Sequence, residues 1–148
     1  MREDVIGRVS FANCDPLFHE LGGHWRILPA PPSWLTGHLL RRECLIAPIP
    51  LADFVKNIDT LQAIDSIGIA SDGGVGSVLL FGDRPIEEMR DIAVPTDSST
   101  SRTLLPWLLS RRGRSPRLIE MGPNLETMLE RCDGALIIGD RAIDEAEI

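Results

Sequence analysis

The sequence predicts an α/β fold with mainly parallel sheets and flanking helices. Three observations lead to this prediction. Short β-branched or apolar runs alternate with helix-like segments along the chain of 148 residues. Some of these runs, such as 45–49 and 135–138, are continuously apolar, as expected for strands that are buried on both faces. Capping residues and prolines open the segments between the runs, which indicates helical crossovers.

The first elements follow from local patterns. A strand is predicted over residues 5–11, where β-branched and aromatic side chains recur with period two. Asp15-Pro16 supplies an N-cap and a proline for the first helical position, so a short helix is predicted over 15–21. A second short strand is predicted at 25–28. A helix follows at 34–42, with leucines on one face.

The middle of the chain is predicted to continue the alternation. The apolar run 45–49 predicts a buried parallel strand, and Pro50 opens a helix that extends to about residue 57. Two further strands are predicted at 61–70 and 75–82, separated by a glycine-containing turn.

The last part of the chain repeats strand and helix regularly. A short helix after Pro85 is followed by strands at 92–94, 117–120 and 135–138, and by helices at 101–111 and 125–132. Asn124 is the expected cap of the second of these helices. This regularity predicts a first lobe over residues 1–88 and a second lobe over residues 89–148, with a hinge near residues 82–90.

Composition limits the classes of function. The net charge is −7, from 15 basic and 22 acidic residues, so nucleic-acid and membrane-surface binding are not expected. No apolar run approaches the length of a membrane span, and no signal peptide is expected, which predicts a cytoplasmic protein. The three cysteines and three histidines lack the spacing of metal ligands, and the cysteines are expected to be small buried residues.

The richest candidate site is the polar run between the predicted strand at 92–94 and the helix that follows it. The run extends from Thr96 to Thr103, and the site residues predicted within it are Ser99, Thr100, Ser101, Arg102 and Thr103. Main-chain N–H groups at a helix start bind anions, hydroxyls add donors, and an arginine can bind a carboxylate with two hydrogen bonds. The same residue types are also common helix caps, so a purely structural role for the run stays open.

Three shorter stretches add candidates. Gly76 and Ser77 lie in a glycine-rich turn without the lysine of a phosphate-binding loop, which indicates either a tight strand crossing or a hydroxyl that faces a cleft. Asn13 ends the first predicted strand, where its amide can bind a polar ligand or form an Asx-turn or cap. Asp140 follows the apolar strand at 135–138 and can cap the next helix or face a cleft.

In combination these stretches resemble the chorismate dehydratase family of menaquinone biosynthesis, which belongs to the futalosine pathway. Five blocks carry the resemblance and span nearly the whole chain: 6–17, 46–49, 71–78, 99–103 and 123–140. The resemblance implies a type II periplasmic-binding-protein-like fold with two lobes and a ligand in the cleft. Family members continue well beyond the position of Ile148, so the resemblance also implies that the first lobe is incomplete.

The resemblance implies a carbon–oxygen lyase that removes water from chorismate to give 3-[(1-carboxyvinyl)oxy]benzoate, with no metal or organic cofactor. It assigns Asn13 and Ser77 to the neighbourhood of the reaction and the run 99–103 to carboxylate binding. We expect Gly76 and Asp140 to line the same site. The expected partner is chorismate, together with either a missing C-terminal segment or a second copy of the chain. Two alternatives stay open: a non-catalytic module that binds small carboxylates, and an inactive truncated homologue.

Overall fold

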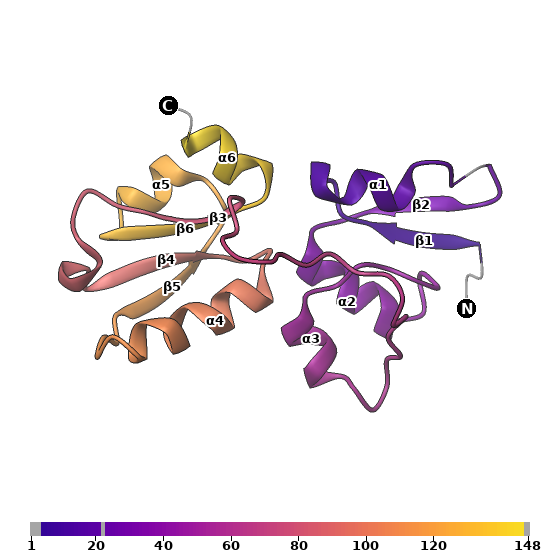
Figure 1. Ribbon diagram of the computed structural model, residues 1–148, viewed down its shortest axis with the longest axis horizontal. Helices are drawn as coiled ribbons and strands as arrows, with labels where there is room; N and C mark the ends of the chain where they lie inside the picture. Colours follow the sequence, from indigo (N-terminus) through magenta and orange to yellow (C-terminus); the bar gives the residue numbers. More distant parts are fainter. Residues whose placement is uncertain (1–3, 22, 147–148) are drawn as a thin grey trace. The chain divides into compact units, whose positions relative to one another are not determined.

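The computed structural model describes residues 4–21 and 23–146 and divides into two compact units, Met1–Asp72 and Gly73–Ile148 (Figure 1). This division falls earlier in the chain than the predicted boundary between residues 88 and 89. The reason is a strand at Val78–Phe81 that pairs with the last strand of the chain and so belongs to the second unit. The predicted hinge segment, 82–90, consequently lies inside that unit.

The first unit contains a small parallel sheet. Strand β1 (Val5–Arg8) pairs in parallel with β2 (Arg26–Pro29), and Val5 lies opposite Arg26. On the other side of β1, the predicted strand at 45–49 contributes only one parallel bridge, between Ile6 and Ile46. The Gly7 N–H donates to the Ile46 carbonyl at 2.8 Å. Parallel pairing is thus confirmed, although the third predicted strand is reduced to a bridge.

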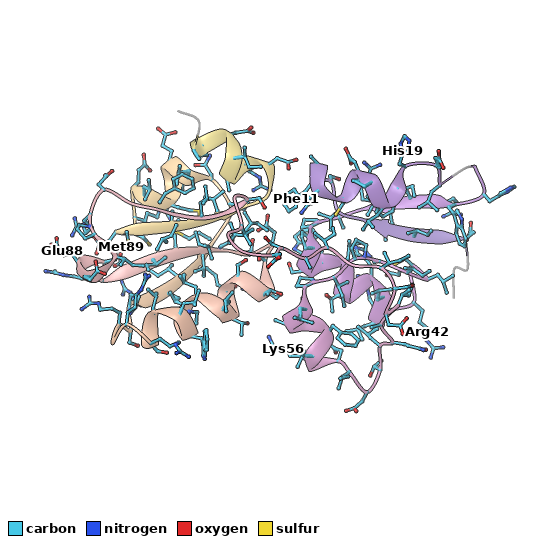
Figure 2. All side chains as sticks on the ribbon, viewed as in Figure 1. Phe11, His19, Arg42, Lys56, Glu88 and Met89 are labelled. Carbon is cyan, nitrogen blue, oxygen red and sulfur yellow. The ribbon has the colours of Figure 1, made fainter. Side chains whose placement is uncertain are left out.

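Short helices and a small core accompany these strands. The helices are η1 (Ala12–Cys14), α1 (Asp15–Phe18), α2 (Pro32–Leu40) and α3 (Leu51–Lys56). Val9, Cys14 and Leu35 form the buried cluster, and Phe11, labelled in Figure 2, packs against it. Gly7 allows the close packing here, because a Cβ at this position would lie 2.6 Å from the Ala47 Cβ and 2.7 Å from the Leu35 Cδ2.

The prediction of a strand at residues 61–70 is wrong. These residues form turns and irregular structure, and Ile64, Ile67 and Ile69 are exposed. A strand requires a partner whose backbone satisfies its N–H and C=O groups. Among the described residues of the first unit, no strand runs beside this segment, so its apolar pattern alone does not produce a strand.

The second unit is built on a four-stranded sheet of order β3-β6-β4-β5. The central strands β6 (Gly134–Ile138) and β4 (Asp91–Pro95) are parallel to each other, and β5 (Arg117–Met121) is parallel to β4. Strand β3 (Val78–Phe81) runs antiparallel to β6 at the other edge. The mainly parallel sheet predicted from the sequence is confirmed here.

Helices cover both faces of this sheet. Helix α4 (Ser99–Ser110) lies on one face, whereas α5 (Leu125–Leu129) and α6 (Asp140–Ala146) lie on the other (Figure 1); a short 3-10 helix, η2 (Ile86–Glu88), precedes β4. Alternate strand residues enter two separate cores. The first core comprises Met89, Ile92, Val94, Leu105, Leu109 and Leu136. The second comprises Ala93, Met128, Cys132, Ala135, Ile137 and Ala142.

The carboxylates of Asp91 and Asp133 form a hydrogen-bond network at the amino edge of this sheet. The Asp133 N–H donates to the Asp91 Oδ1 at 2.9 Å, and the Arg117 Nη2 donates to the Asp91 Oδ2 at 3.1 Å. The Arg90 N–H in turn donates to the Asp133 Oδ2 at 2.8 Å. The Asp133 N–H and then the Arg117 guanidinium lower the pKa of Asp91 below its ordinary value. Within residues 4–21 and 23–146, no helix is both long and apolar enough to cross a membrane.

Candidate functional site

Several predicted site residues converge at the carboxyl edge of the second unit's sheet. The parallel strands β4 and β6 end at this edge, and the antiparallel β3 begins there. The Gly139 N–H donates to the Ser77 carbonyl at 2.8 Å, which joins the start of β3 to the end of β6. Gly76, Ser77, Asp140 and the start of α4 therefore lie at one edge, where open α/β sheets bind their ligands.

Helix α4 begins at this edge with a hydroxyl cap. Ser98 has an extended backbone and is the N-cap, and its Oγ accepts a hydrogen bond from the Ser101 N–H at 3.4 Å. Ser99, Thr100 and Ser101 form the first turn of this 12-residue helix, and Ser99 is buried. The first turn places main-chain N–H groups and the positive end of the helix dipole at the edge. The capping role left open for this run is thus fulfilled by Ser98, a member of the run that is not one of the five predicted site residues.

The other two residues of the run are engaged within the unit. The Arg102 Nη1 pairs with the Glu120 Oε1 of β5 at 2.5 Å. The Thr103 hydroxyl donates to the Ser99 carbonyl at 2.9 Å, one turn back in the helix. To bind a ligand carboxylate, Arg102 would have to exchange the exposed Glu120 for it.

Sequence reasoning missed an ion pair at the same edge, between Asp97 and Arg141. The Arg141 Nη2 donates to the Asp97 Oδ2 at 3.3 Å, and the Arg141 Nη1 donates to the Pro123 carbonyl at 3.0 Å. Asp97 is only 4% exposed, and its Oδ1 is buried with no hydrogen-bond partner among the described residues. Arg141, in the first turn of α6, thereby connects the loops that follow β4 and β5. Asp97 belongs to the predicted polar run 96–103, and the only local signal for Arg141 is its position shortly after the apolar strand at 135–138.

These pairs determine the electrostatics of the edge. Arg102 and Arg141 each face a carboxylate of the protein, so neither guanidinium carries unbalanced charge. An anionic ligand at this edge would therefore rely on hydroxyls and on the N–H groups of the α4 start, or would displace Glu120.

Asn13 lies in the first unit, whereas Ser77 lies in the second. Asn13 is exposed within η1, and its side chain makes no hydrogen bond with the described residues. Helix α1 has Cys14 as its N-cap, without a side-chain cap, so the predicted alternative role of Asn13 as a cap is not realised. An open hollow of about 460 Å³ next to it is lined by Ala12, Asp15, Pro16 and His19.

The chain matches a family model. The family, described as menaquinone biosynthesis, is matched over residues 5–148. The chain belongs to this family. A Thermus thermophilus relative named chorismate dehydratase is 37% identical over 145 residues, which is 97% of this chain and 53% of the relative. The chain thus spans about half the length of this curated relative.

A solved structure supports the fold of this family member. Protein AF1704 from Archaeoglobus fulgidus superposes with a TM-score of 0.74 at 17% identity, over 97% of this chain and 56% of that protein. At this identity the likeness shows the fold alone. It is consistent with the mixed α/β architecture, mostly parallel sheets and flanking helices found here.

The thiols of this family member fit the sequence prediction. Cys14, Cys44 and Cys132 are free and buried, and burial raises the pKa of Cys44 and of Cys132. In the part of the chain that the structure describes, no group of three or more His, Cys, Asp or Glu side chains is arranged to hold a metal ion.

Proposed function

We propose that the chain carries the substrate site of a chorismate dehydratase, which removes water from chorismate to give 3-[(1-carboxyvinyl)oxy]benzoate. The observation that carries this proposal is the convergence of Ser77, the α4 start and Asp140 at one sheet edge. Family membership and the 37% identical relative named chorismate dehydratase support the choice of substrate.

The reaction requires the protein mainly to orient the substrate. Loss of a hydroxyl and a ring proton makes the product ring aromatic, so the elimination is strongly favourable. The protein has to hold two carboxylates and align the departing hydroxyl, which well-placed neutral donors can do. We assign one carboxylate to Ser99, Thr100 and Ser101, with Arg102 as an additional donor once Glu120 is displaced.

Asn13 and Ser77 are the proposed groups near the reacting atoms. A hydroxyl and an amide can donate to a leaving oxygen and accept from a neighbouring group. The ring proton is proposed to pass to the substrate's own side-chain carboxylate and from there to the departing hydroxide, which leaves as water, so no protein base is needed. Gly76 and Asp140 complete the proposed edge, where the glycine leaves room beside the substrate.

Incubation of the purified chain with chorismate tests the proposed dehydratase activity. We expect the aromatic product in liquid chromatography with mass detection, and we expect Asn13→Asp to reduce its rate at least roughly tenfold, because a carboxylate there would repel the substrate's carboxylates. Asp65→Asn, which changes an exposed charge in the same unit, is the control and should leave the rate unchanged. Full activity of Asn13→Asp would contradict the role of Asn13.

A second candidate function is a module that binds small carboxylates without turnover. The observation that favours it is the start of α4, whose hydroxyls and main-chain N–H groups can bind a carboxylate whether or not a reaction follows. A chorismate-dependent rise in melting temperature without product would favour this candidate.

We also propose the cytoplasm as the compartment, as expected from the sequence, and cell fractionation tests this.

A further inference from the structure

The Arg102–Glu120 ion pair lies beside the first turn of α4. Glu120 is near the end of β5, opposite Val94 of β4. Successive side chains of a strand point to opposite faces, so Glu120 shares a face with Leu118, which packs against the core beneath α4. Arg102 follows the first turn of α4, and a helical side chain leans back toward the start of its helix. The guanidinium is therefore close to the N–H groups and hydroxyls proposed to bind a carboxylate.

The two side chains of this pair differ in exposure. The Arg102 side chain is 25% exposed, whereas that of Glu120 is 63% exposed. Arg102 is thus held by its surroundings, but Glu120 can turn into the solvent, where water hydrates its carboxylate. Ion pairs with an exposed member contribute little to stability. Exchange of Glu120 for another carboxylate therefore costs little, while Arg102 keeps a counter-charge throughout.

The pairing with Glu120 also leaves part of the guanidinium unsatisfied. The Arg102 Nη1 pairs with the Glu120 Oε1 at 2.5 Å, but the Arg102 Nε is buried with no hydrogen-bond partner among the described residues. A buried donor without a partner costs free energy, and an arginine binds a carboxylate most strongly through two nitrogens. Another carboxylate can therefore bind Arg102 more strongly than Glu120 does in this arrangement.

Arg141, the other arginine described at this edge, does not offer the same exchange. Its partner Asp97 is 4% exposed, so this carboxylate cannot turn into the solvent. Arg141 also donates to the Pro123 carbonyl at 3.0 Å. Of these two arginines, Arg102 is consequently the one that a ligand can take over.

We propose that Glu120 is an affinity-determining residue of the site at the start of α4: its carboxylate occupies Arg102 in the ligand-free protein, and an organic carboxylate displaces it. Glu120 competes with the ligand within the same molecule, so that only a ligand group with its own negative charge gains Arg102. This role of Glu120 rests on the proposed function, because it takes the start of α4 as the place where a substrate carboxylate binds. Glu120 has no part in the chemical step.

Calorimetric titration with chorismate tests the competition. Glu120→Gln removes the charge and keeps the shape of the side chain, so it should lower the Kd roughly three- to fivefold, in keeping with the small free energy of an exposed ion pair. Glu130→Gln makes the same charge change at an exposed residue of the same unit and should alter the Kd less than about twofold. An unchanged Kd for Glu120→Gln, with or without a loss of stability, would make the pair purely structural and overturn the proposal.

A double-mutant cycle shows whether the effect acts through Arg102. Arg102→Gln should weaken chorismate binding, and adding Glu120→Gln in that background should change the Kd less than about twofold, because no guanidinium is left to compete for. A gain of similar size in both backgrounds would mean that Glu120 repels the ligand directly, which contradicts the exchange.

Benzoate, a simple aromatic carboxylate, separates this proposal from the proposed function. If chorismate binds to none of the proteins, the substrate assignment fails, but benzoate should still bind more tightly to Glu120→Gln than to the unaltered chain. Shifts of the amide NMR signals of residues 98–103 measure this binding. Equal benzoate affinities, or no binding to either protein, would overturn the exchange. Chorismate binding without product would exclude the dehydratase activity and leave the exchange to be decided by the two Kd values.

Discussion

At the scale of single residues, the carboxyl edge of the second unit depends on pairs that are distant in sequence. Asp97 and Arg141 are 44 residues apart, and Arg102 reaches Glu120 of a different strand. Local patterns predicted the hydroxyl run at 99–103 because capping and anion binding use the same residue types. The same patterns could not predict the pairs, since their members meet only after the sheet has formed.

Arg141→Ala should destabilise the protein by about 1–3 kcal/mol, because it leaves a carboxylate that is 4% exposed without its donor. Arg141→Lys should cost less, since an ammonium retains the charge and one hydrogen bond. Urea unfolding measures both. Arg112→Ala, at an exposed arginine outside any described pair, is the control and should change little. An equal loss for Arg112→Ala and Arg141→Ala would mean that the pair with Asp97 is unimportant.

The ionisation of Asp91 should make the unfolding free energy of the protein depend on pH. Its folded pKa is lowered by the Asp133 N–H and by Arg117, so its contribution is complete above the pKa of the unfolded chain, about 4. This contribution is lost as the pH falls through the lowered folded value. The difference in unfolding free energy between the protein and Asp91→Asn should therefore be largest near pH 7 and shrink near pH 3. A pH-independent difference would contradict this, and Asp65→Asn should show no difference at either pH.

At the scale of elements, the sequence predicted those features that depend on a few neighbouring residues, such as helix caps. The Asn124 Oδ1 accepts from the Thr127 N–H at 2.8 Å, as the capping prediction requires. The strand predicted at 61–70 did not form because its apolar pattern has no neighbouring strand among the described residues of the first unit. The antiparallel direction of β3 and the sheet order also lay beyond local patterns, since both depend on which strands meet.

Gly7→Ala should disrupt the first unit. The added Cβ would overlap the Ala47 Cβ and the Leu35 Cδ2, and Leu35 is fully buried and cannot move away. We expect a loss of about 1–3 kcal/mol in unfolding free energy, as for other overpacked cores. Gly68→Ala adds the same methyl where no atom lies within 4 Å and should be nearly neutral. Equal stability of the two variants in thermal unfolding would contradict this account.

At the scale of the whole molecule, the two units should differ in local stability. Strands β4 and β6 of the second unit lie between two buried cores, whereas β1 and β2 adjoin one small cluster. Native-state hydrogen exchange should therefore be slowest for the amides of 92–94 and 134–138 and faster for 5–8 and 26–28. Similar protection in both sheets would argue against unequal units. The sequence patterns indicated two lobes, and the resemblance implied that the first is incomplete, but the burial of each sheet could not be predicted, because it depends on which strands each lobe recruits.

The strand order of the second unit has a consequence for synthesis. Strand β6 lies between β3 and β4, yet its residues, 134–138, are translated after those of every other strand in that sheet. A nascent chain that has not yet released Gly134 from the ribosome has β3 without a partner and β4 with one side open. The second unit therefore closes in one late step, and until then its apolar strands are available to chaperones or to aggregation.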